Sequence, residues 1–330
     1  MIEKKKVILD VDTGSDDAIA IMTAALSPDL EVLGITTVNG NRPVPNTTEN
    51  TLRVIDLLKS DIPVYRGCEE PMVAGLIPER QMRRTKDTEV VDGKTVTYHH
   101  EYLEELPPAV SKPQERSAVS YLIDTLLKSD GDITIIAVGP LTNLGVAMRC
   151  DPRIIPKIKK LVIMGGGHLQ TNTTSAAEFN IWKDPEAAQI VMTSGCDILL
   201  VPLDATHRAY VGKEESNKFR AMGTPVGIAV ADLLDTRIEA YDLMQPIECA
   251  PKGTTPPHDA LAVCAVIDES VLQDVQFRRV DVDFGGSISD GMTVVDSRVR
   301  TDEPKNVHIA MNADREKFVS MLFDILGEGK

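Results

Sequence analysis

The sequence lacks the marks of several protein classes. Its five cysteines are far apart and form no Cys-x-x-Cys pair, so neither a zinc knuckle nor a disulfide framework is indicated, and a reducing cytoplasm is the expected compartment. No uninterrupted apolar run is long enough to span a bilayer, and the basic start before Asp10 is not expected to act as a signal peptide. Basic residues, 35 in number, are also fewer than the 50 acidic ones.

The formal net charge of −15 argues against a nucleic-acid backbone or an anionic membrane as a partner. A small neutral or cationic ligand, or a metal ion, fits this charge better. The 330 residues are 42% hydrophobic and 26% charged, which is typical of a globular protein with a large core.

Short apolar runs alternate with amphipathic stretches, beginning with an expected strand at Val7–Val11 and an expected helix at Asp16–Leu26. This alternation predicts the α/β class: a doubly wound, mainly parallel central sheet with helices on both faces, in a single domain of residues 1–330. Ligands of such sheets bind at the carboxyl ends of the strands. The other expected strands are Val32–Val38, Ile133–Val138, Lys160–Met164, Ile198–Val201, Val275–Phe284, Met292–Val295 and Val307–Met311. The other expected helices are Asn46–Leu58, Leu141–Met148, Asp184–Thr193, Phe219–Asp242, His258–Ile267 and Arg315–Leu326.

Residues 77–106 interrupt this rhythm because they are heavily charged, and they indicate an insertion. Within it, Glu89–Tyr98 predicts a hairpin that turns at Asp92 and Gly93. A surface insertion is the favoured interpretation, ahead of a lid over the active site or an oligomer contact.

Four carboxylates near the N-terminus, Asp10, Asp12, Asp16 and Asp17, are the most informative feature. Strand periodicity places Asp10 and Asp12 on one side, and the other two fall in the first turn of the next helix. Like charges about 4 Å apart repel by roughly 4 kcal/mol at an effective dielectric near 20. A helix capped by Ser15 accounts for Asp16 and Asp17, but not for two acids on a buried strand. A divalent cation with oxygen ligands is therefore favoured.

Three further groups give weaker signals. The backbone carbonyl of Val138 is expected at the carboxyl edge of the sheet, where it could bind a hard cation. His258 and Asp259 open a helix, either as a simple cap or as an acid and a metal ligand. Glu178 and Asn180 share one side if their segment is extended, and they could bind sugar hydroxyls or be ordinary surface residues.

The run Asp10–Ala18 closely resembles the N-terminal signature of the inosine-uridine-preferring nucleoside hydrolases. Similar segments follow in the same order at Ile35–Asn41, Gly139–Asn143, Val162–Gly167, Ala177–Asn180, Asp184–Ala187, Pro202–His207, His258–Ala262, Phe284–Gly286 and Gly291–Asp296. The resemblance implies the nucleoside hydrolase fold with its Rossmann-like core, and hydrolysis of ribonucleosides to ribose and a free base, as in purine or pyrimidine salvage. It also implies a homodimer or homotetramer.

The resemblance further implies a bound Ca²⁺. Its ligands would be Asp10, Asp12, Asp17, Asp259 and the carbonyl of Val138. The residues that would bind the substrate are Asp16, Asn41, Met164, Asn172, Glu178, Asn180 and Asp259. By this resemblance Asp12 takes the proton of a calcium-bound water, which attacks C1′ through an oxocarbenium-like state, and His258 assists departure of the base.

The sequence departs from the family at one place. Many members carry a His-Gly-x-x-Gly-Leu stretch after the third strand, where this chain has Tyr98–Leu103 within the charged insertion. His99 or His100 is the candidate substitute, and Arg237 and Tyr241 are further candidates for the base pocket. The base preference is left open.

Two other functions compete with nucleoside hydrolysis. Haloacid-dehalogenase-like phosphatases share the Asp-x-Asp strand end, but Gly14 stands where they would need Thr or Val. A non-catalytic, calcium-dependent nucleoside- or ribose-binding protein would keep the same residues, although the presence of the base Asp12 favours an enzyme.

Overall fold

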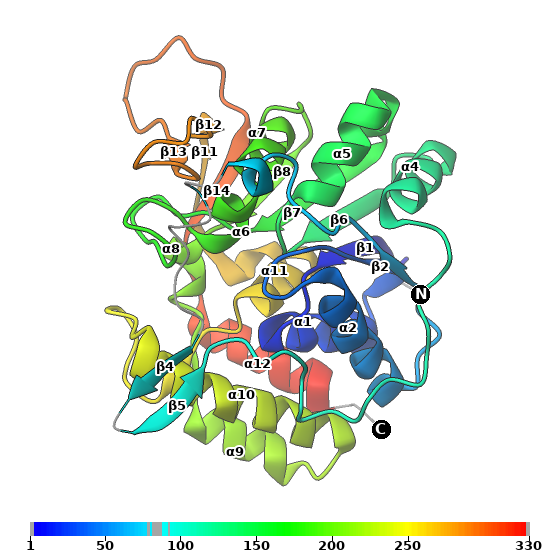
Figure 1. Ribbon diagram of the computed structural model, residues 1–330, viewed down its shortest axis with the longest axis vertical. Helices are drawn as coiled ribbons and strands as arrows, with labels where there is room; N and C mark the ends of the chain where they lie inside the picture. Colours follow the sequence, from blue (N-terminus) through cyan, green and yellow to red (C-terminus); the bar gives the residue numbers. More distant parts are fainter. Residues whose placement is uncertain (1–2, 78–79, 81–87, 92, 328–330) are drawn as a thin grey trace.

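A twisted sheet of eight strands forms the centre of the computed structural model, which describes residues 3–77, 80, 88–91 and 93–327 (Figure 1). Its strand order is β11-β14-β8-β7-β6-β1-β2-β3, and every pairing is parallel except that of the edge strand β11 with β14. The strands are β1 (Lys5–Val11), β2 (Leu30–Thr37), β3 (Val64–Arg66), β6 (Ile133–Ala137), β7 (Ile158–Met164), β8 (Ile198–Val201), β11 (Leu272–Arg278) and β14 (Val307–Ala313). The predicted α/β class with a mainly parallel sheet is confirmed.

Helices cover both faces of this sheet, as a parallel sheet requires. Side chains of β1 alternate between the two cores: Val7, Leu9 and Val11 face one, and Ile8 faces the other. The first core is closed by α1 (Ser15–Leu26), α2 (Val44–Leu58), α8 (Leu203–Thr206), α10 (Pro225–Met244), α11 (His258–Ile267) and α12 (Arg315–Gly327). The second is closed by α4 (Ala118–Lys128), α5 (Thr142–Cys150), α6 (Phe179–Lys183) and α7 (Pro185–Met192).

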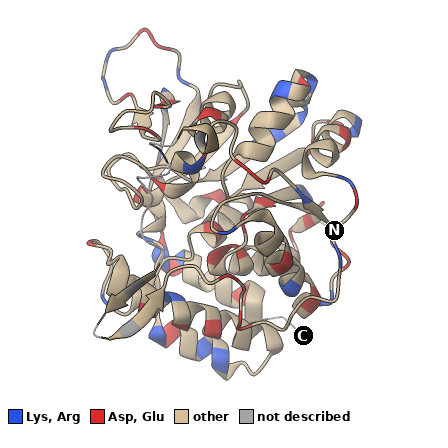
Figure 2. Ribbon diagram, viewed as in Figure 1, with Lys and Arg blue, Asp and Glu red and all other residues tan. Residues whose placement is uncertain are grey.

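Smaller elements complete the described chain. Helix α9 (Lys213–Ala221) packs on α10, and Figure 2 shows acidic and basic residues interspersed along this outer pair. The two-stranded pairs are β4 (Thr88–Val91) with β5 (Lys94–Thr97), β9 (Val211–Gly212) with β10 (Thr254–Thr255), and β12 (Val280–Val282) with β13 (Thr293–Val295). Three 3₁₀ helices span Ala74–Leu76, Pro152–Lys157 and Glu269–Val271. Among the helices of the described residues, none is both long and apolar enough to cross a membrane.

Three local predictions differ from the structure. The strand expected over Val275–Phe284 is two strands, because β11 ends at Arg278 and the chain then leaves the sheet to pair with β13. The helix expected over Phe219–Asp242 is divided between α9 and α10. The Glu178–Asn180 segment is not extended, since Glu178 caps α6 and Asn180 lies inside that helix. Hydrophobic pattern alone does not specify a strand's partner or the point where a helix breaks.

The predicted hairpin in the insertion is formed by β4 and β5, although Asp92 of its turn lies outside the described residues, as do residues 78–79 and 81–87. The chain that follows is attached to the body of the protein. The side chain of Arg42 donates hydrogen bonds to the carbonyls of His99 and His100, and Arg53 on α2 donates to the carbonyl of Leu103. The end of the insertion is therefore fixed in space.

The order of the strands determines where a ligand can bind. From β1 the chain proceeds to β2 and β3 on one side, and later to β6, β7 and β8 on the other. The switch point between β1 and β6 leaves a crevice at the carboxyl ends of these strands, the usual ligand site of doubly wound sheets. Asp12 follows β1 and Val138 follows β6, so both lie at this crevice.

Candidate active site

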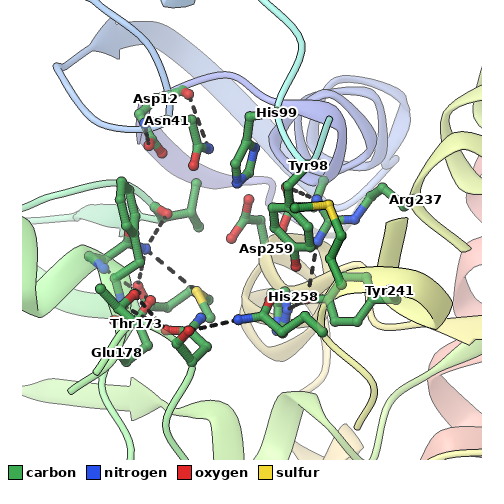
Figure 3. A pocket seen from close by; sticks show the side chains of 18 residues that line it. Asp12, Asn41, Tyr98, His99, Thr173, Glu178, Arg237, Tyr241, His258 and Asp259 are labelled. Carbon is green, nitrogen blue, oxygen red and sulfur yellow. Dashed lines mark hydrogen bonds and ion pairs between the residues drawn. The ribbon is translucent and has the colours of Figure 1, made fainter. Parts of the chain in front are cut away.

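A pocket of about 390 Å³ lies at the switch point, within the size range of small-molecule sites. Its lining comes from the ends of β1, β6 and β7, from α6, α10 and α11, and from the end of the insertion. The residues that line it are Asp12, Asp16, Asn41, Tyr98, His99, Val138, Met164, Asn172, Thr173, Glu178, Phe179, Asn180, Arg237, Tyr241, Met244, Gln245, His258 and Asp259. In Figure 3, Asp12, Asn41 and Glu178 lie opposite His258, Tyr241 and Arg237, with Asp259 between them.

Asp12 is held tightly at the end of β1. Its Oδ2 accepts a hydrogen bond of 2.7 Å from the backbone N–H of Asn41. Two glycines leave room for this carboxylate: a Cβ at Gly40 would lie 2.0 Å from Oδ2, and one at Gly139 would lie 2.8 Å from Oδ1. Any larger residue at either position would displace Asp12. The surrounding backbone thus holds the Asp12 side chain in one orientation.

Three buried acids form a cluster beside Asp12. Ligand oxygens of Asp16, Asp17 and Asp259 lie within 4.8 Å of one another. The two oxygens of Asp17 accept hydrogen bonds from the backbone N–H groups of Asp12 and Gly14. Helix α1 begins at Ser15, and its N-cap is Gly14 rather than the expected Ser15; Asp17 reaches back to the N–H of this N-cap. Asp16 of α1 and Asp259 of α11 line the pocket, whereas Asp17 lies behind them and does not line it.

Burial and mutual repulsion make this arrangement costly for the protein alone. Burial first, and the charge of Asp16 second, raise the pKa of Asp17 to about 7. Burial and the neighbouring carboxylates raise the pKa of Asp12 and of Asp259 well above the ordinary value. A hard divalent cation fits this site, because its charge would offset the repulsion and the donors are all oxygen.

Two of the expected cation ligands have additional partners. Asp10 does not line the pocket; its Oδ1 accepts hydrogen bonds from Thr36 and Asn143, whereas its buried Oδ2 has no hydrogen-bond partner among the described residues. The carbonyl of Val138 lines the pocket and accepts a hydrogen bond of 2.8 Å from Asn180. Since a carbonyl has two lone pairs, this bond leaves one free.

The sugar-binding candidates gather around α6. Glu178 accepts hydrogen bonds from the backbone N–H groups of Gly166 and Asn180, and burial raises its pKa to about 7. The side chain of Asn172 accepts a hydrogen bond from the N–H of Phe179. Met164 lies at the end of β7, where its carbonyl also contacts the Asn180 amide. These residues, expected from resemblance to bind ribose, all line the pocket.

His258 lies at the opposite end, as the first residue of α11. Its Nε2 lies 2.5 Å from the hydroxyl of Tyr241, and its Nδ1 lies 2.7 Å from the hydroxyl of Thr206. Burial lowers the pKa of His258 well below its ordinary value and raises the pKa of Tyr241 to about 12. Both groups are therefore neutral near pH 7, and both line the pocket.

The base-pocket candidates differ in position. Tyr241 and Arg237 line the pocket from one face of α10, and His99 lines it from the insertion. His100 is exposed and does not line the pocket. The insertion also supplies Tyr98, whose ring centroid is 5.4 Å from that of Tyr241. The prediction of a purely surface insertion is therefore wrong for this end, because the contacts with α2 and with Arg42 bring it back over the crevice.

Several pocket residues were absent from the sequence candidates. Phe179 lies between two candidates, Glu178 and Asn180, and this position in the sequence was the only indication that it lines the pocket. Gln245 donates a hydrogen bond to the carbonyl of Asn172, joining the end of α10 to the loop before α6. Such contacts connect residues far apart in the chain, so no local pattern indicates them.

The fold and the site together define a class: a doubly wound α/β protein whose pocket combines a carboxylate cluster with hydrogen-bonding groups for a small polar ligand. Residues 7–320 match the family model of the inosine-uridine preferring nucleoside hydrolases. The chain belongs to this family, and it is an N-glycosyl hydrolase of ribonucleosides. Family membership disfavours both the phosphatase and the non-catalytic alternatives.

Individual relatives agree with this assignment. The chain is 36% identical over 321 residues to the pyrimidine-specific ribonucleoside hydrolase RihB of Escherichia coli strain SE11, covering 96% of this chain and 95% of that protein. Among solved structures, the plant nucleoside hydrolase PpNRh1 superposes with a TM-score of 0.83 at 31% identity, covering 99% of this chain and 100% of the other. The purine-preferring ribonucleoside hydrolase from Gardnerella vaginalis gives 0.80 at 29% identity, with coverage of 98% and 99%.

Proposed function

We propose that Asp12 is the general base that removes a proton from the water attacking C1′ of a ribonucleoside. The position of Asp12 carries this proposal: its carboxylate is buried, fixed by Asn41, and presented to the pocket between two glycines that no larger residue could replace. A base held in one orientation needs little reorganisation during the reaction.

The residues around α6 would bind the ribose. Asn172 and Glu178 line the pocket, and so does Asn41, whose backbone N–H donates a hydrogen bond to Asp12. When the glycosidic bond breaks, C1′ becomes positively charged. The ionised form of Glu178 and the carboxylate cluster would stabilise this charge in a buried environment. Asn180 acts mainly by fixing the carbonyls of Val138 and Met164.

A calcium ion fits the carboxylate cluster, and Asp12, Asp17, Asp259 and the carbonyl of Val138 would hold it, with Asp10 behind them. When bound, this ion would acidify a water molecule and anchor the ribose hydroxyls. Two observations support a bound cation: Oδ2 of Asp10 has no hydrogen-bond partner in the part of the chain that the structure describes, and the pKa values of Asp12, Asp17 and Asp259 are raised.

The opposite end of the pocket would bind the base. His258 and Tyr241 are neutral, and the 2.5 Å hydrogen bond between them can carry a proton toward the departing base. The relatives named above differ in their stated preference, pyrimidine for one and purine for another. We expect the residues around Arg237 and Tyr98 to determine whether this enzyme prefers a purine or a pyrimidine base.

Release of reducing sugar from inosine, uridine, cytidine, adenosine and guanosine tests the proposal. We expect ribose release with calcium present, and loss of that release in Asp12→Asn. An Asp12→Asn enzyme with near-normal turnover would remove Asp12 as the base. A cytoplasmic location and a homodimer or homotetramer remain predictions, which cell fractionation and light scattering would check.

A further inference from the structure

We infer that Arg237 is a positioning residue for Asp16, and that it thereby helps the enzyme select ribonucleosides over 2′-deoxyribonucleosides. This inference rests on the proposed function and on the family resemblance, which implies that the carboxylate of Asp16 accepts a hydrogen bond from the ribose 2′-hydroxyl. Arg237 lies on α10, whereas Asp16 lies in the first turn of α1, so only the tertiary structure joins them.

The contact between the two side chains is direct and buried. Nη1 of Arg237 lies 3.1 Å from Oδ1 of Asp16 and 3.1 Å from the hydroxyl of Ser15. Arg237 is 3% exposed, so water does little to weaken this ion pair. One guanidinium nitrogen thus holds two consecutive residues at the start of α1. This contact is made by Oδ1 of Asp16, and the Asp16 side chain also lines the pocket.

Asp16 needs such a partner because its surroundings repel it. Its ligand oxygen lies within 4.8 Å of those of Asp17 and Asp259. Among the described residues that line the pocket, Arg237 is the only lysine or arginine. Without it, the Asp16 side chain would reduce the repulsion by rotating away from the cluster. The ion pair opposes this rotation and keeps the carboxylate directed into the pocket.

Arg237 is itself held in place by two aromatic rings. Its guanidinium carbon lies 5.3 Å from the ring centroid of Tyr241 and 5.8 Å from that of Tyr98, within the range of cation–π interaction. Figure 3 shows Arg237 beside these two rings, on the far side of the pocket from Asp12. Tyr98 comes from the insertion. The insertion therefore contributes to the position of Asp16, because Tyr98 contacts Arg237 and Arg237 pairs with Asp16.

Selectivity follows from what each substrate offers to Asp16. A ribonucleoside presents a 2′-hydroxyl, which donates a hydrogen bond to the carboxylate, whereas a 2′-deoxyribonucleoside presents none. Loss of a hydrogen bond to a charged group corresponds to about a tenfold to hundredfold loss of affinity. Displacing Asp16 should therefore weaken the binding of ribonucleosides and leave that of deoxyribonucleosides nearly unchanged.

The test is Arg237→Met, which removes the charge and keeps most of the side-chain length. KM and kcat are measured for uridine and inosine, and the competitive inhibition constants for 2′-deoxyuridine and 2′-deoxyinosine. We expect KM to rise about tenfold with little change in either inhibition constant. Arg237→Lys should restore part of the loss, since a lysine retains the charge but not the fork geometry. Arg220→Met is the matched control, because Arg220 of α9 pairs with Asp232 and Asp235 of α10 and does not line the pocket.

A double-mutant cycle with Asp16→Asn separates positioning from other roles. If Arg237 acts through Asp16, Arg237→Met adds nothing further in the Asp16→Asn background. Equal weakening of ribo- and deoxyribonucleosides, or additive effects in the cycle, would overturn the inference. If Arg237→Met does not fold, Arg237→Lys carries the same comparison with a smaller expected rise in KM. A wild-type enzyme that cleaves no nucleoside would contradict the proposed function itself. If the wild type is active, but Arg237→Met leaves the ratio of the KM for ribonucleosides to the inhibition constant for deoxyribonucleosides unchanged, only the role of Arg237 is contradicted.

Discussion

Removal of the cation should destabilise the protein in a way that depends on pH. The pKa of Asp17 rises from 3.8 to about 7 in the folded protein, mainly through burial. One pKa unit corresponds to about 1.4 kcal/mol, so keeping Asp17 ionised costs the cation-free protein about 4 kcal/mol. Because the folded-state pKa lies above the unfolded value, this cost is absent below pH 3.8 and complete above about pH 7.

A bound calcium ion would remove this cost by stabilising the ionised form. For 330 residues, an unfolding entropy of about 2 cal/mol/K per residue converts 4 kcal/mol into a shift in Tm of about 6 °C. The assay is thermal unfolding with calcium or with a chelator, at about pH 8 and about pH 5. We expect the larger difference at the higher pH, where the carboxylates have lost their protons.

Two variants sharpen this experiment. Asp259→Asn removes one buried charge of the cluster, so it should raise the Tm of the chelated protein and reduce the response to calcium. Asp184→Asn is the matched control: Asp184 is equally buried but lies outside the pocket, where it accepts hydrogen bonds from Thr142 and Met72. It should lower Tm with and without calcium alike. A calcium-dependent shift of equal size at both pH values would refute the reasoning.

Three further substitutions test the catalytic groups. Asp12→Asn should leave the unfolding transition in place and reduce kcat by orders of magnitude, as measured by ribose release; an unchanged kcat would exclude Asp12 as the base. His258→Ala should slow the hydrolysis of natural nucleosides more than that of a nitrophenyl riboside, whose leaving group needs no proton, and equal losses would argue against a role in base departure. Gly40→Ala should reduce kcat although Gly40 has no functional group, because its Cβ would lie 2.0 Å from Oδ2 of Asp12; normal kinetics would show that Asp12 tolerates displacement.

The α/β class was accessible from sequence because each element of the sheet carries its own local signal. The apolar runs at β1, β8 and α11 depend on residues next to one another, and the expected bounds Ile198–Val201 and His258–Ile267 are those of the structure. The four acids near the N-terminus were equally visible, since clustered like charges require compensation wherever the chain places them. Their individual roles came only from resemblance to a family.

The sequence by itself therefore determined the fold class, the acidic cluster and the family. The tertiary structure decided which distant residues complete the site. Arg237 meets Asp16 across 221 positions of the chain, and Tyr98 reaches the pocket because Arg42 and Arg53 fix the end of the insertion. A local pattern contains no record of such contacts, because they depend on how strands and helices pack in space. This is why the carboxylates and Arg237 could be found in the sequence as separate candidates, whereas the ion pair between Arg237 and Asp16 could not.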